Sequence, residues 1–240
     1  MDTNTLTPAL YLFPVPLSTG PASDVLPALN LELLHTVRHF VVENVRTARR
    51  FLRAADPSFD IDACQFTELS EHTAATEVDA MLAPLLAGNS VGVLSEAGCP
   101  AVADPGALLV AAAQRRGLRV VPLVGPSSIL LALMASGFNG QSFAFVGYLP
   151  VEGKTRSQRI KELERLAARH GQTQIFIETP YRNDRLLAEL AQTLSPETPL
   201  CVATDITGPG QSIRTMAAHR WHGATIGKVP TIFLIGNQQQ

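Results

Sequence analysis

Short apolar segments alternate along the whole chain with longer segments in which apolar residues recur at helical spacing. A strand that continues through a helix into the next strand pairs with it in parallel, because the crossover returns the chain to the starting edge of the sheet. The first half is therefore predicted to form an α/β fold with a mainly parallel sheet. Its expected elements are the strands 9–14, 39–42, 90–94 and 120–123 and the helices 73–87 and 105–116.

The alternation starts again after a Gly-Pro turn at Gly125 and Pro126. The last strands of this half have no helices between them, which favours antiparallel neighbours and a second, mixed sheet. We therefore expect two domains, 1–124 and 125–240. The expected elements of the second half are the helices 127–136, 155–169 and 183–194 and the strands 143–148, 174–178, 200–204, 212–216 and 231–235.

Composition limits the classes of function. Of 240 residues, 46% are hydrophobic and 17% are charged, which suits a chain with a substantial buried core. The three cysteines show no metal-ligand spacing, and no apolar run approaches the roughly 18 residues of a membrane span. We expect a cytoplasmic protein without metal or membrane attachment. The net charge of −2 means that any nucleic acid would bind through local basic patches.

Two turns that contain glycine follow predicted strands, where open α/β sheets bind ligands. The longer one, Leu94-Ser-Glu-Ala-Gly-Cys-Pro-Ala-Val-Ala-Asp-Pro-Gly106, supplies polar side chains beside glycines. The other, Val124-Gly-Pro-Ser-Ser-Ile129, places hydroxyls at a helix start. Both turns also fit a purely structural role, with Asp104, Ser127 or Ser128 capping the following helix.

These turns and four further segments resemble, in order, the motifs of the S-adenosylmethionine-dependent tetrapyrrole methylases. The turns are similar to S-D-A-G-T-P…D-P-G and V-P-x-P-G-x-S, and Ala135–Phe138 to S-G-L. Phe145–Pro150 is similar to F-x-G-F-L-P, Ile175–Arg182 to I-F-Y-E-S-P-H-R, and Leu69–Thr73 to L-x-x-H-N. The likeness spans roughly residues 10–205. The F-x-G-F-L-P and E-S-P-H-R segments point to the branch that methylates small-subunit ribosomal RNA.

The resemblance implies a two-domain class III methyltransferase fold, with a parallel N-terminal sheet, a mixed C-terminal sheet and a cofactor trough between them. It also implies a homodimer that uses S-adenosyl-L-methionine and methylates the 2′-hydroxyl of a cytidine ribose in ribosomal RNA or the small ribosomal subunit. The cofactor-binding residues that it implies are Ser95, Glu96, Ala97, Val102, Ala103, Asp104, Ser127, Ser128, Tyr148, Leu149, Glu178, Thr179, Pro180 and Thr231.

A ribose hydroxyl has a high pKa, so its methylation benefits from a base or a nearby cation. We take Glu43, after a predicted strand, as the catalytic candidate with Arg46 beside it. Alternatively, Glu43 caps the helix that starts near Val45 and pairs with Arg46 structurally. His72 is a second candidate base, although a lone His is more often a hydrogen-bonded structural residue.

Two basic clusters could neutralise RNA phosphates. The first is Arg49, Arg50 and Arg53, in a segment that has no acid between residues 44 and 55. The second begins with Lys154, Arg156 and Arg159 and continues to residue 169, but Glu162 and Glu164 interrupt it. A solvated helix face is the alternative for the second cluster.

The chain departs from the family pattern at three places. It has Val15-Pro-Leu-Ser-Thr19 for T-P-I-G-N, Glu43-Asn-Val-Arg46 for E-D-T-R, and Thr204-Asp-Ile-Thr-Gly208 for R-E-L-T-K. Two alternatives to the RNA methyltransferase therefore stay open. One is a methylase of a small tetrapyrrole-like substrate, and the other is a cofactor-binding member that has lost catalysis.

Overall fold

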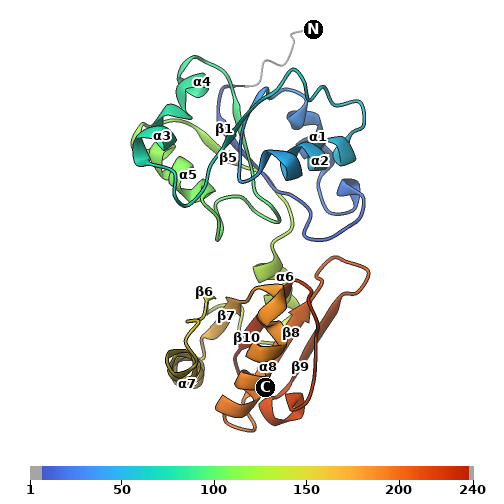
Figure 1. The fold of residues 1–240 in the computed structure, drawn as a ribbon, viewed down its shortest axis with the longest axis vertical. Helices are drawn as coiled ribbons and strands as arrows, with labels where there is room; N and C mark the ends of the chain where they lie inside the picture. Colours follow the sequence, from blue (N-terminus) through green and yellow to red (C-terminus); the bar gives the residue numbers. More distant parts are fainter. Residues whose placement is uncertain (1–6, 238–240) are drawn as a thin grey trace. The chain divides into compact units, whose positions relative to one another are not determined.

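The computed structural model describes residues 7–237, and the chain divides into two compact units, Met1–Pro126 and Ser127–Gln240. Each unit has its own five-stranded sheet with helices packed on it (Figure 1). The predicted α/β class with two sheets is confirmed. The division falls at Pro126, at the Gly-Pro turn, rather than at residue 124.

The sheet of the first unit is entirely parallel, in the order β3-β2-β4-β1-β5. Within it, Phe13 and Val42 both pair with Leu94, so three strands end at the same edge. The turns that follow these strands therefore meet at this carboxyl edge. The strands are β1 (Leu10–Phe13), β2 (His39–Val42), β3 (Gln65–Glu68), β4 (Val91–Leu94) and β5 (Val120–Pro122).

Helices cover both faces of this sheet because its central strands are apolar on both sides. In β1, Leu10 and Leu12 pack on one face, and Tyr11 and Phe13 pack on the other. Figure 1 shows α1 and α2 on one side of the strands and α3, α4 and α5 on the other. The helices are α1 (Ala28–Leu34), α2 (Val45–Ala55), α3 (Ala75–Ala80), α4 (Ala83–Leu86) and α5 (Gly106–Arg115), with a short 3-10 helix η1 (Ala22–Asp24).

The first unit differs from the prediction in the helix expected over 73–87 and in two elements that were not predicted, helix α1 and strand β3. The single helix expected over 73–87 is two short helices, α3 and α4, because Pro84 lacks an amide hydrogen and its ring clashes with the carbonyl of a preceding turn. The edge strand β3 was not predicted. Its residues are mostly exposed, so they carry little of the apolar signal that marks a buried strand.

The sheet of the second unit is mixed, in the order β6-β7-β10-β8-β9. Only β6 and β7 are parallel, and they are joined through helix α7, whereas β10, β8 and β9 pair antiparallel. This confirms the mixed sheet expected from strands without intervening helices. The strands are β6 (Phe143–Tyr148), β7 (Thr173–Ile177), β8 (Pro199–Thr204), β9 (Ser212–Ala217) and β10 (Thr231–Ile235).

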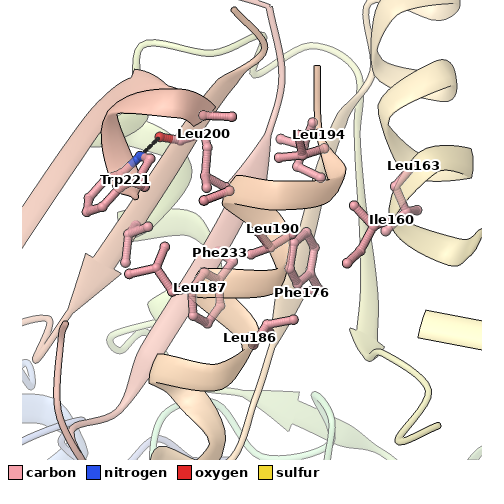
Figure 2. Close-up of a cluster of buried hydrophobic side chains, with 14 of the residues drawn as sticks. Ile160, Leu163, Phe176, Leu186, Leu187, Leu190, Leu194, Leu200, Trp221 and Phe233 are labelled. Carbon is pink, nitrogen blue, oxygen red and sulfur yellow. Dashed lines mark hydrogen bonds between the residues drawn. The ribbon is translucent and has the colours of Figure 1, made fainter. Parts of the chain in front are cut away.

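The core of the second unit lies between this sheet and two long helices (Figure 2). The rings of Phe176 and Phe233 stack 5.8 Å apart, and Trp221 Nε1 donates to the carbonyl of Leu200 at 3.2 Å. Each fully buried side chain of this size contributes about 1.5–3 kcal/mol. The helices are α6 (Ser128–Ser136), α7 (Gly153–His170) and α8 (Asn183–Thr193), with the 3-10 helices η2 (Pro180–Arg182) and η3 (Ala218–Trp221).

Candidate active site

Two polar turns meet at the carboxyl edge of the first unit's sheet. Val42 and Leu94 are paired neighbours at the ends of β2 and β4. Glu43 and Ser95 follow them directly, and Oε1 of Glu43 accepts the backbone N–H of Glu96 at 2.8 Å. Glu43 therefore connects the end of β2 to the turn that follows β4.

Asp104 holds the rest of the turn after β4. Its two carboxylate oxygens each lie 2.9 Å from the backbone nitrogen of Ala101, and Oδ1 also accepts the N–H of Gly106 at 2.7 Å. Ala101 and Ala103 both have positive φ, 67° and 61°. Non-glycine residues in that region cost of order 1–3 kcal/mol each, so the surrounding contacts must enforce this shape. Asp104 supplies these contacts.

Burial raises the pKa of both carboxyl groups at this edge. For Glu43, the N–H of Glu96 opposes the effect, while the negative charges of Asp104 and Glu96 add to it. For Asp104, the N–H groups of Gly106 and Ala101 oppose the raised pKa. No cation is among these causes. The amide hydrogens offset the effect of burial only in part, which leaves Glu43 a stronger base than an ordinary carboxylate.

The helix-capping alternative for Glu43 is wrong. The side chain of Asn44 caps α2, and its Oδ1 accepts the N–H groups of Arg46 at 2.9 Å and Thr47 at 3.2 Å. Asn performs this task as well as Asp, so the departure from E-D-T-R preserves the cap. Arg46 is exposed, and no ion pair joins it to Glu43 among residues 7–237. The other candidate base, His72, is also exposed and lies 3.6 Å from Glu71.

The predicted cofactor residues of the turn after β4 lie at this edge. Glu96, Ala97, Val102 and Ala103 are exposed. Oγ of half-buried Ser95 donates within the turn to the carbonyls of residues 97 and 98, at 3.3 and 3.4 Å. The arrangement offers backbone groups and carboxylates to a ligand that carries positive charge.

The turn after β1 is joined to the turn after β4. Val15 and Gly98 exchange two backbone hydrogen bonds of 2.9 Å. Gly98 has φ +75°, and a Cβ there would lie 3.1 Å from Leu17, so a larger residue would be strained. The departure at residues 15–19 therefore keeps the backbone contact that supports the candidate site.

Ser127 and Ser128 lie at the start of the second unit. Oγ of Ser127 accepts the N–H of Leu130 at 3.4 Å and caps α6, while Ser128 is the first residue of that helix. The capping role expected as one alternative is confirmed for Ser127. Both side chains are half-buried.

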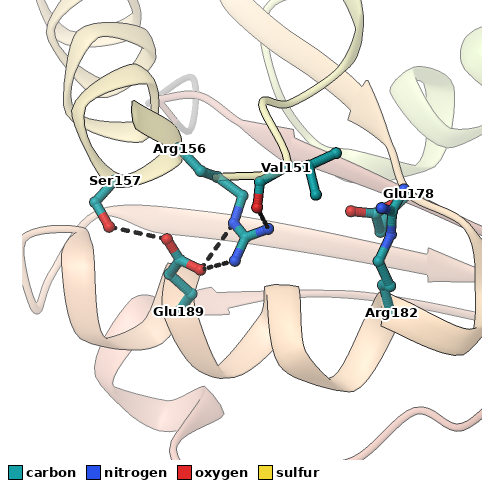
Figure 3. Close-up of polar contacts among 6 residues, drawn as sticks. All are labelled: Val151, Arg156, Ser157, Glu178, Arg182 and Glu189. Atoms are coloured by element: carbon teal, nitrogen blue, oxygen red, sulfur yellow. Dashed lines mark hydrogen bonds and ion pairs between the residues drawn. The ribbon is translucent and has the colours of Figure 1, made fainter. Parts of the chain in front are cut away.

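The turn after β7 is built around a buried carboxylate (Figure 3). Oε1 of Glu178 accepts the N–H of Thr179 at 2.7 Å and the Nε of Arg182 at 3.0 Å, and it lies 2.7 Å from Nη2 of Arg182. Pro180 begins the η2 turn between them. The carboxylate of Glu178 therefore binds residues of its own turn.

The remaining cofactor candidates of this unit differ in accessibility. Tyr148 ends β6 opposite Ile177 and is exposed, whereas the side chain of Leu149 is packed in the core. Thr231 is buried, and its hydroxyl donates to the carbonyl of Val229 at 2.9 Å and accepts from Nδ2 of Asn183 at 3.0 Å. The Thr231 side chain is thus engaged inside the unit.

The arginines of α2 form a basic surface on the first unit. Arg50 and Arg53 are exposed. Arg49 pairs with Asp62 at 3.2 Å and lies over the ring of Phe66, 5.8 Å from its centroid. Two of these three guanidinium groups therefore lack an ion-pair partner within the described part of the chain.

The prediction that Arg156 belongs to the second RNA-binding cluster is wrong. Its side chain is only 2% exposed, and its guanidinium pairs with Glu189 on α8 and donates to the carbonyl of Val151 at 3.1 Å (Figure 3). A buried, paired arginine presents no charge to RNA, so this residue leaves the predicted set. Lys154 is exposed, and Arg159 pairs with Glu162 at 2.5 Å.

Sequence reasoning missed Arg182 and Tyr181, which lie inside the E-S-P-H-R-like segment. The signal was present, because this segment contributed its first three residues, Glu178, Thr179 and Pro180, to the predicted site and its last two to none.

Within residues 7–237, no helix is long and apolar enough to cross a membrane. The same residues contain no group of three or more His, Cys, Asp or Glu placed to hold a metal ion.

Comparison with known proteins identifies the family. Residues 17–219 match the model of the tetrapyrrole (corrin/porphyrin) methylases. The chain is 32% identical over 209 residues to a ribosomal RNA small subunit methyltransferase I of Vibrio cholerae, covering 87% of this chain and 68% of that protein. It is 35% identical over 210 residues to the protein of that name in Mesorhizobium japonicum, covering 88% and 67%.

Solved structures share the fold. The methyltransferase CobJ superposes with a TM-score of 0.63 at 20% identity, covering 96% of this chain and 95% of that one. The uroporphyrin-III-C-methyltransferase of Thermus thermophilus gives a TM-score of 0.53 at 18% identity, covering 96% and 93%. The chain belongs to the tetrapyrrole (corrin/porphyrin) methylase family and is a methyltransferase of the kind that uses S-adenosylmethionine.

Proposed function

We propose that this enzyme methylates small-subunit ribosomal RNA at the 2′-hydroxyl of a cytidine ribose. The observation that supports the RNA substrate is the 32–35% identity, over 87–88% of the chain, to proteins named ribosomal RNA small subunit methyltransferase I. The cytidine 2′-hydroxyl comes from the family resemblance of the sequence motifs. The fold alone does not choose the substrate, because the structural neighbours include a uroporphyrin methyltransferase.

The polar turns fit S-adenosylmethionine chemically. Its sulfonium is positive, and the edge of the first unit carries the carboxylates of Glu43 and Glu96 together with backbone groups in a left-handed conformation. We infer that Asp104, Glu178 and Thr231 position the turns, because their polar atoms bind their own units. The residues that would contact the cofactor are Ser95, Glu96, Ala97, Val102, Ala103, Ser127, Ser128, Tyr148, Thr179, Pro180 and the backbone of Leu149.

The chemistry needs little more than alignment and removal of a proton. Bound S-adenosylmethionine supplies a methyl group that is already activated on a sulfonium, so its transfer leaves a neutral thioether. The new O–CH3 bond forms at the ribose oxygen as the S–CH3 bond breaks. Glu43 accepts the hydroxyl proton, and burial favours this role by raising its pKa. Arg46, exposed in the first turn of α2, stabilises the developing oxyanion.

RNA would be held by cations on both units. Arg49, Arg50 and Arg53 contribute on α2, and Lys154 and Arg159 contribute on α7. Such contacts neutralise phosphates without reading sequence, so affinity should fall steeply with salt. We also propose, from the family resemblance, that the enzyme is a cytoplasmic homodimer, which sedimentation equilibrium can test for its oligomeric state.

The test is transfer of labelled methyl from S-adenosylmethionine to small ribosomal subunits purified from cells that lack this gene. We expect label in the RNA, at a nucleotide that resists alkaline hydrolysis because its 2′-oxygen is methylated. Label on a base would overturn the ribose assignment. Label only on an added tetrapyrrole precursor would overturn the RNA assignment.

Glu43→Gln tests the base. The amide keeps an oxygen that can accept the N–H of Glu96 but cannot take the hydroxyl proton. We expect kcat to fall about 100-fold, with little change in affinity for S-adenosylhomocysteine. Glu71→Gln is the matched control, since Glu71 is exposed and lies near only His72. Equal activity of the two variants would remove Glu43 from the mechanism.

A further inference from the structure

The carboxyl edge of the β6–β7 pair in the second unit exposes two tyrosines. Tyr148 ends β6 and is 58% exposed, and Tyr181 lies in η2, just after β7, and is 70% exposed. Large aromatic side chains are usually mostly buried, so two exposed rings at one sheet edge need an explanation.

The Tyr181 ring has a guanidinium over it that is itself fixed. Arg182 CZ lies 5.7 Å from the ring centroid. The guanidinium is held by the buried carboxylate of Glu178 and by Oγ1 of Thr179, which lies 3.0 Å from its Nε. Two residues of the same turn, Glu178 and Thr179, therefore hold a cation beside a ring whose remaining surface is open to solvent. A ring that is held in place before binding loses little conformational freedom when a ligand stacks on it.

The neighbouring turn adds to the same edge. The carbonyl of Val151, two residues after the core residue Leu149, is held by the buried guanidinium of Arg156 at 3.1 Å, while the Val151 side chain is 65% exposed. Lys154 follows in the first turn of α7 and is exposed. The edge thus combines aromatic rings, an apolar side chain and cations.

We propose that Tyr181, with Arg182 beside it, is a stacking platform for an unpaired base of the RNA substrate. Single-stranded RNA is recognised by stacking of splayed bases on aromatic rings and arginine planes, with cations nearby for the phosphates. Val151 and Lys154 extend this platform along the edge. The inference rests on the proposed function and adds to it that the substrate is bound at an unpaired nucleotide.

The test compares Tyr181→Ala with Tyr181→Phe, which keeps the ring. The probe is a short single-stranded oligocytidylate, with an RNA duplex of equal length as a second ligand. We expect the alanine variant to bind the single strand at least about fivefold more weakly and the phenylalanine variant to stay within about twofold. Phe143→Ala is the matched control, because Phe143 is 39% exposed at the opposite end of β6.

Arg182→Lys separates the guanidinium from its charge. Lysine keeps one positive charge but cannot reproduce the planar fork that Glu178 and Thr179 hold. We expect this variant to bind the single strand more weakly than the unaltered protein does, by a smaller factor than Tyr181→Ala. The free energy of unfolding of Tyr181→Ala should match that of the unaltered protein, because the ring is largely exposed.

Each remaining outcome has a definite meaning. Unchanged affinity of Tyr181→Ala for the single strand overturns the platform and leaves the proposed function intact. A loss of affinity for S-adenosylhomocysteine in Tyr181→Ala also overturns it, because the ring would then belong to the cofactor site. Failure of the unaltered enzyme to bind or methylate RNA overturns the proposed function, and the platform with it, before any variant is made.

Discussion

Both units hold their polar turns with carboxylates, but the partners of these carboxylates differ. In the first unit, the hydrogen bonds that Glu43 and Asp104 accept within residues 7–237 come from backbone N–H groups, and burial raises the pKa of both. In the second unit, Glu178 and Glu189 each hold an arginine. For Glu189, burial alone would raise the pKa, but hydrogen bonds from Arg156 and Ser157 outweigh it and lower the pKa.

The two kinds of partner affect the proton affinity of a carboxyl group in opposite directions. A carboxylate balanced only by amides has a raised affinity for protons, which suits a group that must accept one. A carboxylate paired with a guanidinium keeps its charge and fixes the turn around it. The contrast supports the role in proton transfer that we propose for Glu43, and it gives the turn after β7 a rigid geometry.

The largest expected effect comes from breaking the buried pair in the second unit. Arg156→Met leaves Glu189 charged and without its guanidinium at the packing surface of α7 and α8, which should cost about 3–5 kcal/mol of unfolding free energy. The matched control is Arg159→Met on the same helix, whose partner Glu162 is half-exposed. It should cost no more than about 0.5 kcal/mol. Denaturant titration measures both.

A smaller effect is expected from the amide-bound carboxylate of the first unit. Asp104→Ala removes the acceptor for the N–H groups of Ala101 and Gly106, which should cost about 1–3 kcal/mol. It should also weaken S-adenosylhomocysteine binding about tenfold, because the turn would relax. Asp24→Ala, at an exposed acid of the same unit, is the control for both the unfolding free energy and the S-adenosylhomocysteine affinity, which calorimetry can measure. Unchanged ligand affinity in Asp104→Ala would contradict the role in positioning.

The smallest expected effect is a pair of opposite pH dependences. The pKa of Glu189 is lowered in the folded state, so its stabilising contribution is present above about 4.5 and is lost as pH falls. The pKa of Asp104 is raised, so its contribution is greatest below 3.8 and is lost as pH rises through the folded value.

The free energy of unfolding of Glu189→Gln should therefore fall further below that of the unaltered protein as pH rises from 4 to 7. For Asp104→Asn, the deficit in unfolding free energy relative to the unaltered protein should shrink over the same interval. Unfolding free energies measured at several pH values test the two signs. The same sign for both variants would show that the partners of the two carboxylates do not differ in effect.

The sequence by itself determined the architecture and the chemistry of the turns. Alternating strand and helix periodicities predicted the parallel and mixed sheets, because these patterns reflect which faces must leave water. The motif order pointed to the methylase family and to the residues of the turn after β4. The helical spacing over 73–87 did not predict the break near Pro84.

Only the tertiary structure decided what each charged side chain does. Arg156 lies in the same basic run as Lys154, yet one is buried against Glu189 and the other is exposed. Glu43 reaches the N–H of Glu96, which is 53 residues away in the chain. The free energy of a charge depends on its burial and on its nearest partners, and both are set by segments that are distant in sequence. The local sequence pattern therefore predicts the helices and strands, whereas the contacts between distant segments determine the electrostatics of each charged group.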